Sequence, residues 1–151
     1  MKKFITKNAE ETRALGVRLA LTFQGGEIVC LRGELGAGKT TFAQGMLRAL
    51  GAEPPYTSPT FVVIKQYKID NDKSRIRNVY HLDTYRVEVE DVLELSWKEL
   101  VADKDNVIII EWPNKMKDII PAEALWIDFK WLDESKREIV FSRNVDMREF
   151  M

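Results

Sequence analysis

The sequence is poor in cysteine and histidine, with one of each among 151 residues. A lone Cys30 has no disulfide partner, which excludes a disulfide-stapled scaffold and fits a reducing compartment. We interpret Cys30 as a buried structural thiol, because it lies inside the apolar run EIVCLR. A single histidine, His81, excludes a multi-histidine metal site, and we interpret it as a packed, hydrogen-bonded imidazole.

Long apolar runs and an excess of one charge are also absent. No stretch approaches the roughly 18 apolar residues of a membrane span, and the first eleven residues turn polar after two lysines, unlike a signal peptide. The 23 Lys+Arg nearly balance the 24 Asp+Glu, so composition gives no global electrostatic argument for nucleic acid. We therefore expect a cytoplasmic protein that contacts neither a membrane nor DNA.

The apolar content of 45% is enough to bury one sizeable core at this length. The expected elements, in chain order, are a helix over 9–23, a strand over 27–32, a helix with an apolar stripe over 42–50, two strand-rich runs over 60–69 and 78–87, one or two short helices within 88–104, a buried strand over 106–112, and a hairpin of 124–132 and 136–143. This order predicts a single α/β domain over residues 1–151. Its sheet should be mainly parallel, with antiparallel edge strands and helices on both faces.

The stretch from Gly33 to Thr40, GELGAGKT, matches the pattern G-x-x-x-x-G-K-[ST] without a mismatch. It lies between an apolar strand and a helix, as the pattern requires. Glycines let the backbone curl so that successive N–H groups point toward an anion, and the helix start adds its positive dipole end. The turn is therefore predicted to bind a nucleoside triphosphate, with Lys39 reaching the β and γ phosphates and the Thr40 hydroxyl binding Mg²⁺.

A Mg²⁺–nucleotide site also needs an acidic residue at the end of a buried strand near this turn. Glu111 ends the run VIIIE and Asp83 follows the run VYHL, so both are candidates. Ligands of open α/β sheets bind at the carboxyl ends of the strands, where both acids are expected. Trp112 is a candidate cover for the nucleotide, although core packing is the favoured interpretation of the tryptophans.

Several classes of protein fit such a turn. A GTPase is disfavoured, because NKMKD over residues 114–118 places its aspartate one residue beyond the N-K-x-D pattern. A small-molecule kinase normally carries a lid with arginines, for which the chain has little room. A nucleotide-dependent module whose output is contact with another protein fits the length best. The basic residues within 65–77 could contact RNA or an acidic partner, but a solvated hairpin is the favoured interpretation.

Four motifs together carry a more specific resemblance. GELGAGKTTF, TSPTFVVIKQY, YHLDTYRVE and VIIIEWP are similar, in order and spacing, to the motifs of the bacterial TsaE family, formerly YjeE. The resemblance covers nearly the whole chain and implies a P-loop fold that binds ATP and Mg²⁺. It also implies that the protein hydrolyses ATP slowly and is an auxiliary component of tRNA threonylcarbamoyladenosine biosynthesis. The implied partners are homologues of TsaB and of TsaD, the subunit that modifies the adenosine beside the anticodon. The protein would therefore contact tRNA indirectly, through this complex.

The resemblance also implies roles for individual residues. The expected phosphate contacts come from the glycine turn and the helix start, namely Gly36, Ala37, Gly38, Lys39, Thr40 and Thr41. Mg²⁺ would be held by Thr40 and Glu111, and Asp83 would serve hydrolysis by positioning water or the shell of the metal. Lys39, Asp83 and Glu111 are thus the expected catalytic residues.

Two further regions receive roles from the resemblance. Thr57, Ser58 and Thr60 would form a switch-like loop after the helix, where NTPases sense the γ phosphate. The base would lie near Asn8 and Ala9 and near Lys136 in the last hairpin.

One departure from the family pattern concerns Ser96-Trp97, where relatives usually carry a glycine followed by an aliphatic residue. A glycine would allow a tight turn that serine does not favour.

The alternatives to the ATPase function are a small-molecule P-loop kinase and a non-hydrolytic, ATP-dependent assembly switch.

Overall fold

The computed structural model describes residues 1–56 and 64–147. Its elements, in chain order, are β1 (Lys2–Thr6), α1 (Ala9–Ala20), β2 (Ile28–Gly33), α2 (Lys39–Leu50), β3 (Ile64–Lys68), β4 (Asn78–Asp83), α3 (Val89–Leu93), α4 (Trp97–Ala102), β5 (Asn106–Glu111), the 3₁₀ helix η1 (Pro113–Ile119), β6 (Leu125–Trp131) and β7 (Arg137–Phe141). None of the helices in the described part of the chain is long and apolar enough to cross a membrane.

The strands form one mixed sheet in the order β1-β7-β6-β2-β5-β4-β3. The four inner strands β6, β2, β5 and β4 run parallel to one another. Antiparallel pairs complete both sides, with β7 and β1 beyond β6 and with β3 beyond β4. The predicted α/β class, with a parallel centre and antiparallel edges, is confirmed.

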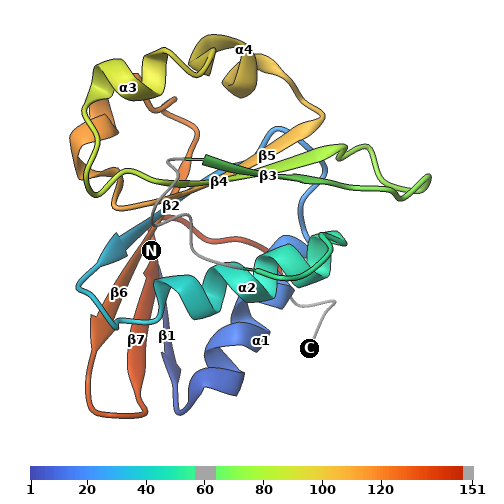
Figure 1. Ribbon diagram of the computed structural model, residues 1–151. Coiled ribbons are helices and arrows are strands. Elements are labelled where there is room, and N and C mark those ends of the chain that lie inside the picture. The colour runs from blue at the N-terminus through green and yellow to red at the C-terminus, as the bar shows by residue number, and fades with distance from the viewer. Residues whose placement is uncertain (57–63, 148–151) are drawn as a thin grey trace.

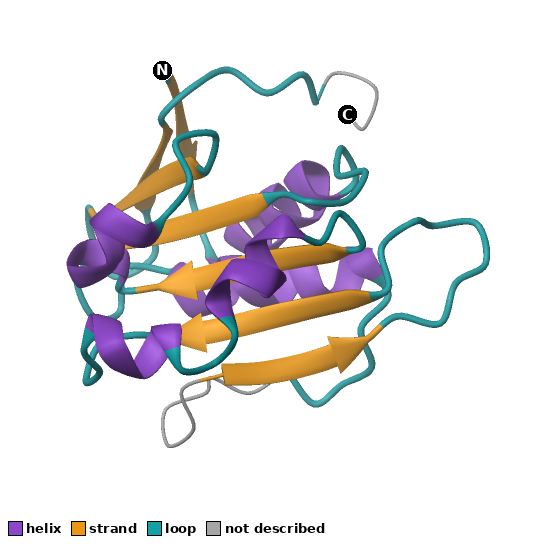
Figure 2. Ribbon diagram, turned by 90° about the horizontal axis from the view of Figure 1, so that it is seen from above, coloured by secondary structure: helices purple, strands orange, loops and turns teal. Residues whose placement is uncertain are grey.

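Helices cover both faces of this sheet (Figures 1 and 2). The strand residues alternate between two cores: Val29 and Ile109 pack with α1 and α2 in one core, and Cys30 and Ile108 pack with Val92 of α3 in the other. Because both faces of β2 and β5 are covered, these strands read as continuous apolar runs. Burial raises the pKa of the Cys30 thiol to about 12, against the opposing charge of Arg32.

Helices α1 and α2 cross at a point where neither has room for a side chain. A β-carbon on Gly16 would overlap the backbone carbonyl of Phe42, and one on Gly45 would overlap the carbonyl of Arg13. The two glycines therefore let the helix backbones touch. This close crossing brings the start of α1 beside the glycine turn between β2 and α2.

The predicted elements differ from the structure mainly at their ends. Helix α1 begins at Ala9 as expected, capped by the Asn8 carboxamide, which accepts from the Glu11 N–H at 2.8 Å, but it ends at Ala20 instead of residue 23. Strand β4 ends at Asp83, so the last part of the 78–87 run is not strand. Strand β1 was not predicted, because it forms only by pairing with β7 at the other end of the chain.

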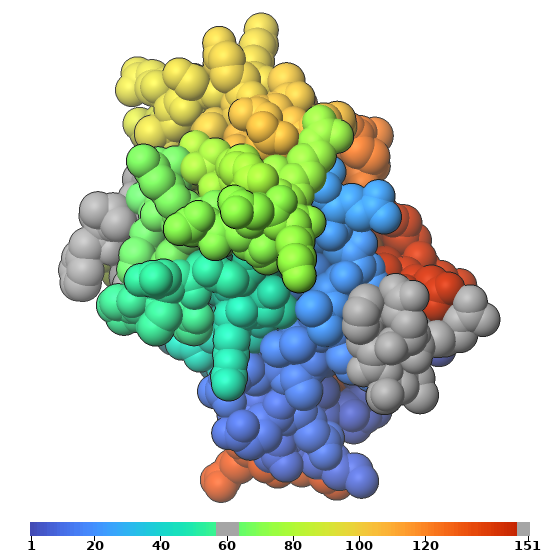
Figure 3. Space-filling model, turned by 90° about the vertical axis from the view of Figure 1, so that its right-hand side faces the viewer, coloured from blue at the N-terminus to red at the C-terminus, as the bar shows by residue number. Residues whose placement is uncertain are grey.

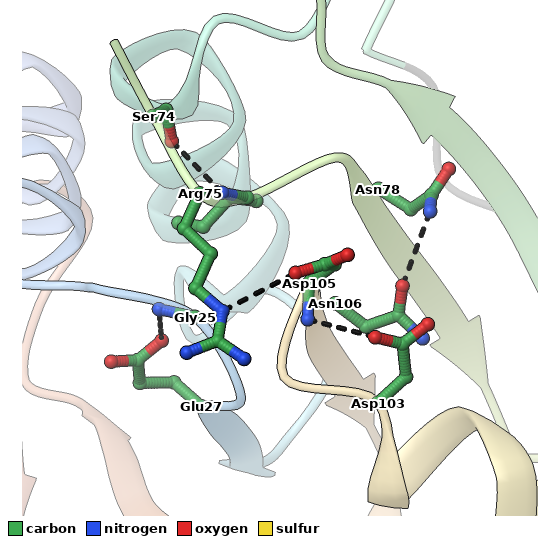
Figure 4. A network of polar contacts seen from close by, with 9 residues as sticks. Gly25, Glu27, Ser74, Arg75, Asn78, Asp103, Asp105 and Asn106 are labelled. Carbon is green, nitrogen blue, oxygen red and sulfur yellow. Dashed lines mark hydrogen bonds and ion pairs between the residues drawn. The ribbon is translucent and has the colours of Figure 1, made fainter. Parts of the chain in front are cut away.

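The segment between β3 and β4 is anchored beside the amino ends of β4 and β5 (Figure 4). Arg75 Nε donates to Asp105 Oδ1 at 3.3 Å, and Asn78 Nδ2 donates to Asn106 Oδ1 at 3.2 Å. Figure 3 shows this segment on the surface between α2 and α4. Among the basic residues within 65–77, Arg75 forms an ion pair with Asp105, in which both side chains stay exposed.

Candidate functional site

The glycine turn connects the carboxyl end of β2 to the start of α2. Gly36 and Gly38 have φ angles of 80° and 105°, in the left-handed region that side chains with a β-carbon avoid. Gly38 is the N-cap of α2 and has no side chain to satisfy the first N–H groups of the helix. These N–H groups and the positive end of the helix dipole are therefore available to an anion.

Lys39 opens α2 and folds back over the turn. Its ammonium donates to the backbone carbonyls of Gly33 and Glu34, at 2.5 and 2.9 Å. The Nζ atom also lies 3.9 Å from the centre of the Trp112 ring, a cation–π contact. The cation is thus held by carbonyls and an aromatic face, and among the described residues it forms no ion pair with a carboxylate.

The electrostatic state of Lys39 follows from that environment. The residue is 5% exposed. Desolvation lowers the pKa of its ammonium below the ordinary value, and the charges of Glu111, Asp83 and Glu34 oppose this shift. Binding an anion next to Lys39 would compensate the desolvation.

The two candidate acids end neighbouring parallel strands, where Asp83 of β4 is the register partner of Glu111 of β5. Glu111 is 2% exposed, and its two oxygens have different partners. Oε1 accepts from the Thr40 hydroxyl at 3.1 Å, and Oε2 contacts Nε2 of His81 at 2.6 Å. Asp83 is half-buried and accepts from the backbone N–H of Tyr85 at 3.0 Å.

A cavity of about 900 Å³ opens over these groups. It is lined by Asn8, Ala9, Thr12, Leu35, Gly36, Gly38, Lys39, Thr40, Thr41, Asp83, Tyr85, Arg86, Val87, Glu111, Trp112, Glu134, Ser135 and Arg137. The volume falls at the upper end of the range for small-molecule sites. Three distant parts of the chain thus meet there: the start of α1, the carboxyl ends of the central strands, and the β6–β7 hairpin.

Most of the residues singled out in the sequence line this cavity, with two exceptions. Ala37 is fully buried beneath the turn and is not part of the lining. Lys136 is exposed, and its backbone N–H caps the hairpin turn by donating to Asp133 Oδ1 at 2.7 Å. Its neighbours Ser135 and Arg137 line the cavity in its place. The expected switch residues Thr57, Ser58 and Thr60 lie outside the described residues.

Sequence reasoning missed several residues of the lining. Arg137 reaches the site from β7, where its Nε donates to the carbonyl of Gly36 at 3.2 Å. Arg86 reaches the lining from the segment after β4. Neither arginine belongs to a periodic pattern or to the glycine turn, so their position follows only from the fold.

Trp112 is held in the left-handed region, with φ of 60°, directly after Glu111. Its backbone carbonyl accepts from the Thr84 hydroxyl at 2.5 Å, which ties the segments after β4 and β5 together. Its ring contacts the Tyr85 ring, with 4.8 Å between ring centres. The tryptophan therefore lines the site, which core packing alone would not require.

A mixed sheet with a parallel centre, a glycine-rich turn after β2 and a lysine at the start of the following helix together define an α/β protein of the P-loop class. A family profile described as "Threonylcarbamoyl adenosine biosynthesis protein TsaE" matches residues 6–139. The chain belongs to the TsaE family. The resemblance drawn from the motifs is thereby confirmed.

Individual relatives agree with this assignment. A protein from Bacillus subtilis named "tRNA threonylcarbamoyladenosine biosynthesis protein TsaE" is 37% identical over 140 residues, covering 93% of this chain and 84% of its own length. Proteins of the same name from a Nostoc species and from Aquifex aeolicus are 38% and 32% identical, covering 91% and 92% of this chain and 83% and 94% of their own lengths. The crystal structure of Bacillus subtilis YdiB matches with a TM-score of 0.71 at 32% identity, covering 93% of this chain and 83% of that one.

Proposed function

We propose that this chain binds ATP with Mg²⁺ and hydrolyses it slowly, as a component of tRNA threonylcarbamoyladenosine biosynthesis. The observation that carries the proposal is the convergence of Lys39, Thr40, Asp83 and Glu111 on one cavity next to a glycine turn. The pathway is supported by family membership and by the names of the relatives.

The glycine turn supplies the phosphate-binding part of the site. The N–H groups at the start of α2 have no side-chain cap and can donate to phosphate oxygens. Lys39 can exchange its present carbonyl partners for β and γ phosphate oxygens, which are stronger acceptors for a cation. This exchange would move the ammonium relative to Trp112, because it now lies over the indole ring.

The donor set fits Mg²⁺ bound together with a nucleotide. The Thr40 hydroxyl and the Glu111 carboxylate are oxygen donors already within 3.1 Å of each other. Within the described ranges, no group of three His, Cys, Asp or Glu residues could hold a metal alone. This suits Mg²⁺, which typically takes one or two protein ligands and completes its shell with phosphates and water. When bound, Mg²⁺ would neutralise charge on the phosphate oxygens.

Asp83 is the residue we assign to hydrolysis. It lines the cavity beside Glu111 but is less buried, and within the described part of the chain no hydrogen bond joins its side chain to Thr40 or His81. A carboxylate at the rim of the phosphate site can orient a water for attack on the γ phosphate. We therefore assign metal binding to Glu111 and water positioning to Asp83.

We infer that the protein acts with homologues of TsaB and TsaD and meets tRNA through that complex. The test is ATP hydrolysis by the pure protein, first alone and then with TsaB, TsaD and tRNA, with Lys39→Ala as the control. The proposal expects hydrolysis that the partners stimulate and that Lys39→Ala abolishes. Hydrolysis unchanged by the partners, with no effect on tRNA modification, would contradict the proposed role and direct attention to phosphoryl transfer onto a small acceptor.

A further inference from the structure

The only histidine of the chain contacts the acid that the proposed function assigns to the metal. His81 lies on β4, two residues before Asp83, so both side chains point to the same face of the sheet. The imidazole is 1% exposed. It is thus buried within the sheet and is not among the residues that line the cavity.

The contacts of Glu111 define what His81 can do there. His81 Nε2 lies 2.6 Å from Oε2 of Glu111, while the other oxygen of the carboxylate, Oε1, faces Thr40 at 3.1 Å. One oxygen is therefore anchored from below, and the other is presented to the hydroxyl at the start of α2. A partial rotation of the carboxylate about its last bond would lengthen both contacts, and only a half-turn, which exchanges the two equivalent oxygens, would restore them.

The protonation pattern of the ring follows from its burial. His81 Nδ1 is buried and has no hydrogen-bond partner within the described part of the chain. A proton on Nδ1 would be a donor without an acceptor, which is costly away from water, whereas an unpaired nitrogen lone pair costs less. The Glu111 carboxylate needs a donor, so the proton belongs on Nε2 and the imidazole donates to Oε2.

We propose that His81 is a positioning residue that fixes the orientation of the Glu111 carboxylate for Mg²⁺, an inference that rests on the proposed function. Residues that hydrogen-bond to metal ligands fix their geometry, and losing such a partner weakens metal affinity by about 10- to 100-fold. His81 does not contact the nucleotide in this account. Its substitution should therefore change the Mg²⁺ requirement and leave metal-free nucleotide binding unchanged.

The experiment measures the affinity of the protein for a fluorescent ADP analogue in EDTA and along a Mg²⁺ titration. His81→Leu removes the donor, and His81→Gln keeps an N–H near the position of Nε2. Val79→Ala, on the same strand and the same face, controls for lost packing because Val79 belongs to the core and not to the site. Thermal melting of each variant reports whether it is folded.

We expect His81→Leu to need roughly 10-fold or more Mg²⁺ for half-maximal effect while its affinity in EDTA equals that of the wild type. His81→Gln should restore the wild-type Mg²⁺ response, and Val79→Ala should lower the melting temperature alone. A normal Mg²⁺ response in His81→Leu, or an equal loss of affinity with and without Mg²⁺, would overturn the inference.

A second pair keeps the test decisive if His81→Leu does not fold. The amide of His81→Asn is one methylene shorter than that of His81→Gln and falls short of Glu111, so only the glutamine should retain the Mg²⁺ response. Equal responses of the two amides would overturn the inference. Failure of the proposed function has a separate signature, because the wild type itself would then bind no nucleotide or show no Mg²⁺ effect.

Discussion

Asp83 and Glu111 stand side by side at the carboxyl ends of β4 and β5, as register partners in two parallel strands. Their environments differ despite this symmetry. Glu111 is buried between Thr40 and His81, whereas Asp83 is half-buried at the cavity wall. These different environments support our proposal that Glu111 binds the metal and that Asp83 positions water.

Substitution of Asp83 should separate nucleotide binding from hydrolysis. We expect Asp83→Asn to bind ATP with near wild-type affinity. Its rate of ATP hydrolysis should fall by about 100-fold or more, since the amide keeps the shape of the side chain but loses the charge that orients water. Single-turnover hydrolysis together with an equilibrium binding assay measures both effects. Glu134→Gln, at the hairpin side of the cavity, is the matched control. Equal hydrolysis by the wild type and Asp83→Asn would remove Asp83 from the mechanism.

The lowered pKa of Lys39 predicts a pH-dependent contribution to stability. Desolvation brings the pKa of the folded protein below the ordinary 10.5. Between these two values the unfolded chain binds more protons than the folded chain, so the contribution of this group to stability rises with pH through that window. Below the window the cost of burying the cation is fully present.

Urea unfolding of the wild type and of Lys39→Met, from neutral pH to above 10.5, measures this contribution. The free energy of unfolding of the wild type should increase relative to that of Lys39→Met as pH rises. Lys130→Met, at an exposed position of β6, controls for the loss of one positive charge. A constant difference between the wild type and Lys39→Met across the range would show that burial does not disfavour the charged form.

The crossing of α1 and α2 should couple stability to nucleotide binding. Gly45→Ala places a methyl group against the carbonyl of Arg13, and we expect a loss of about 1–3 kcal/mol in the free energy of unfolding. ATP affinity should fall as well, because the start of α1 lines the cavity. Denaturant unfolding and ATP titration test the two effects, with Arg48→Ala on the exposed side of α2 as control. Unchanged stability would contradict the close backbone contact.

Substitution of Ser96 by glycine should increase the stability of the fold. Ser96 has a φ of 61° at the start of α4, and its side chain makes no capping hydrogen bond. Glycine adopts this conformation without the strain of a β-carbon, so Ser96→Gly should stabilise the fold by roughly 1 kcal/mol. Ser96→Ala keeps the β-carbon and should give no gain. A urea-unfolding midpoint for Ser96→Gly below that of the wild type would contradict the claim that the left-handed backbone at this position is strained by a β-carbon.

The same residue shows where the sequence was sufficient. The unusual Ser96-Trp97 pair pointed to a turn for which serine is unfavourable, and the structure places Ser96 in the left-handed region. The glycine turn and the buried strand β5 were likewise predicted, because both depend on local pattern: glycine spacing in one case and a continuous aliphatic run in the other.

Other parts of the site depend on contacts between distant residues and could not be predicted in this way. Arg137 meets Gly36 only because β7 pairs with β6 and β6 lies beside β2. His81 was correctly interpreted as a packed, hydrogen-bonded imidazole, but its partner Glu111 lies on another strand. Strand β1 was missed for the same reason, since its five residues find their pairing in β7.

The most direct test of the account is calorimetric titration of ATP with Mg²⁺ into the wild-type protein and into Lys39→Ala. The account predicts saturable binding of one ATP per chain for the wild type, weakened strongly in EDTA and lost in Lys39→Ala. Binding of equal strength by both proteins, or no binding by the folded wild type, would contradict the claim that this cavity is a nucleotide site.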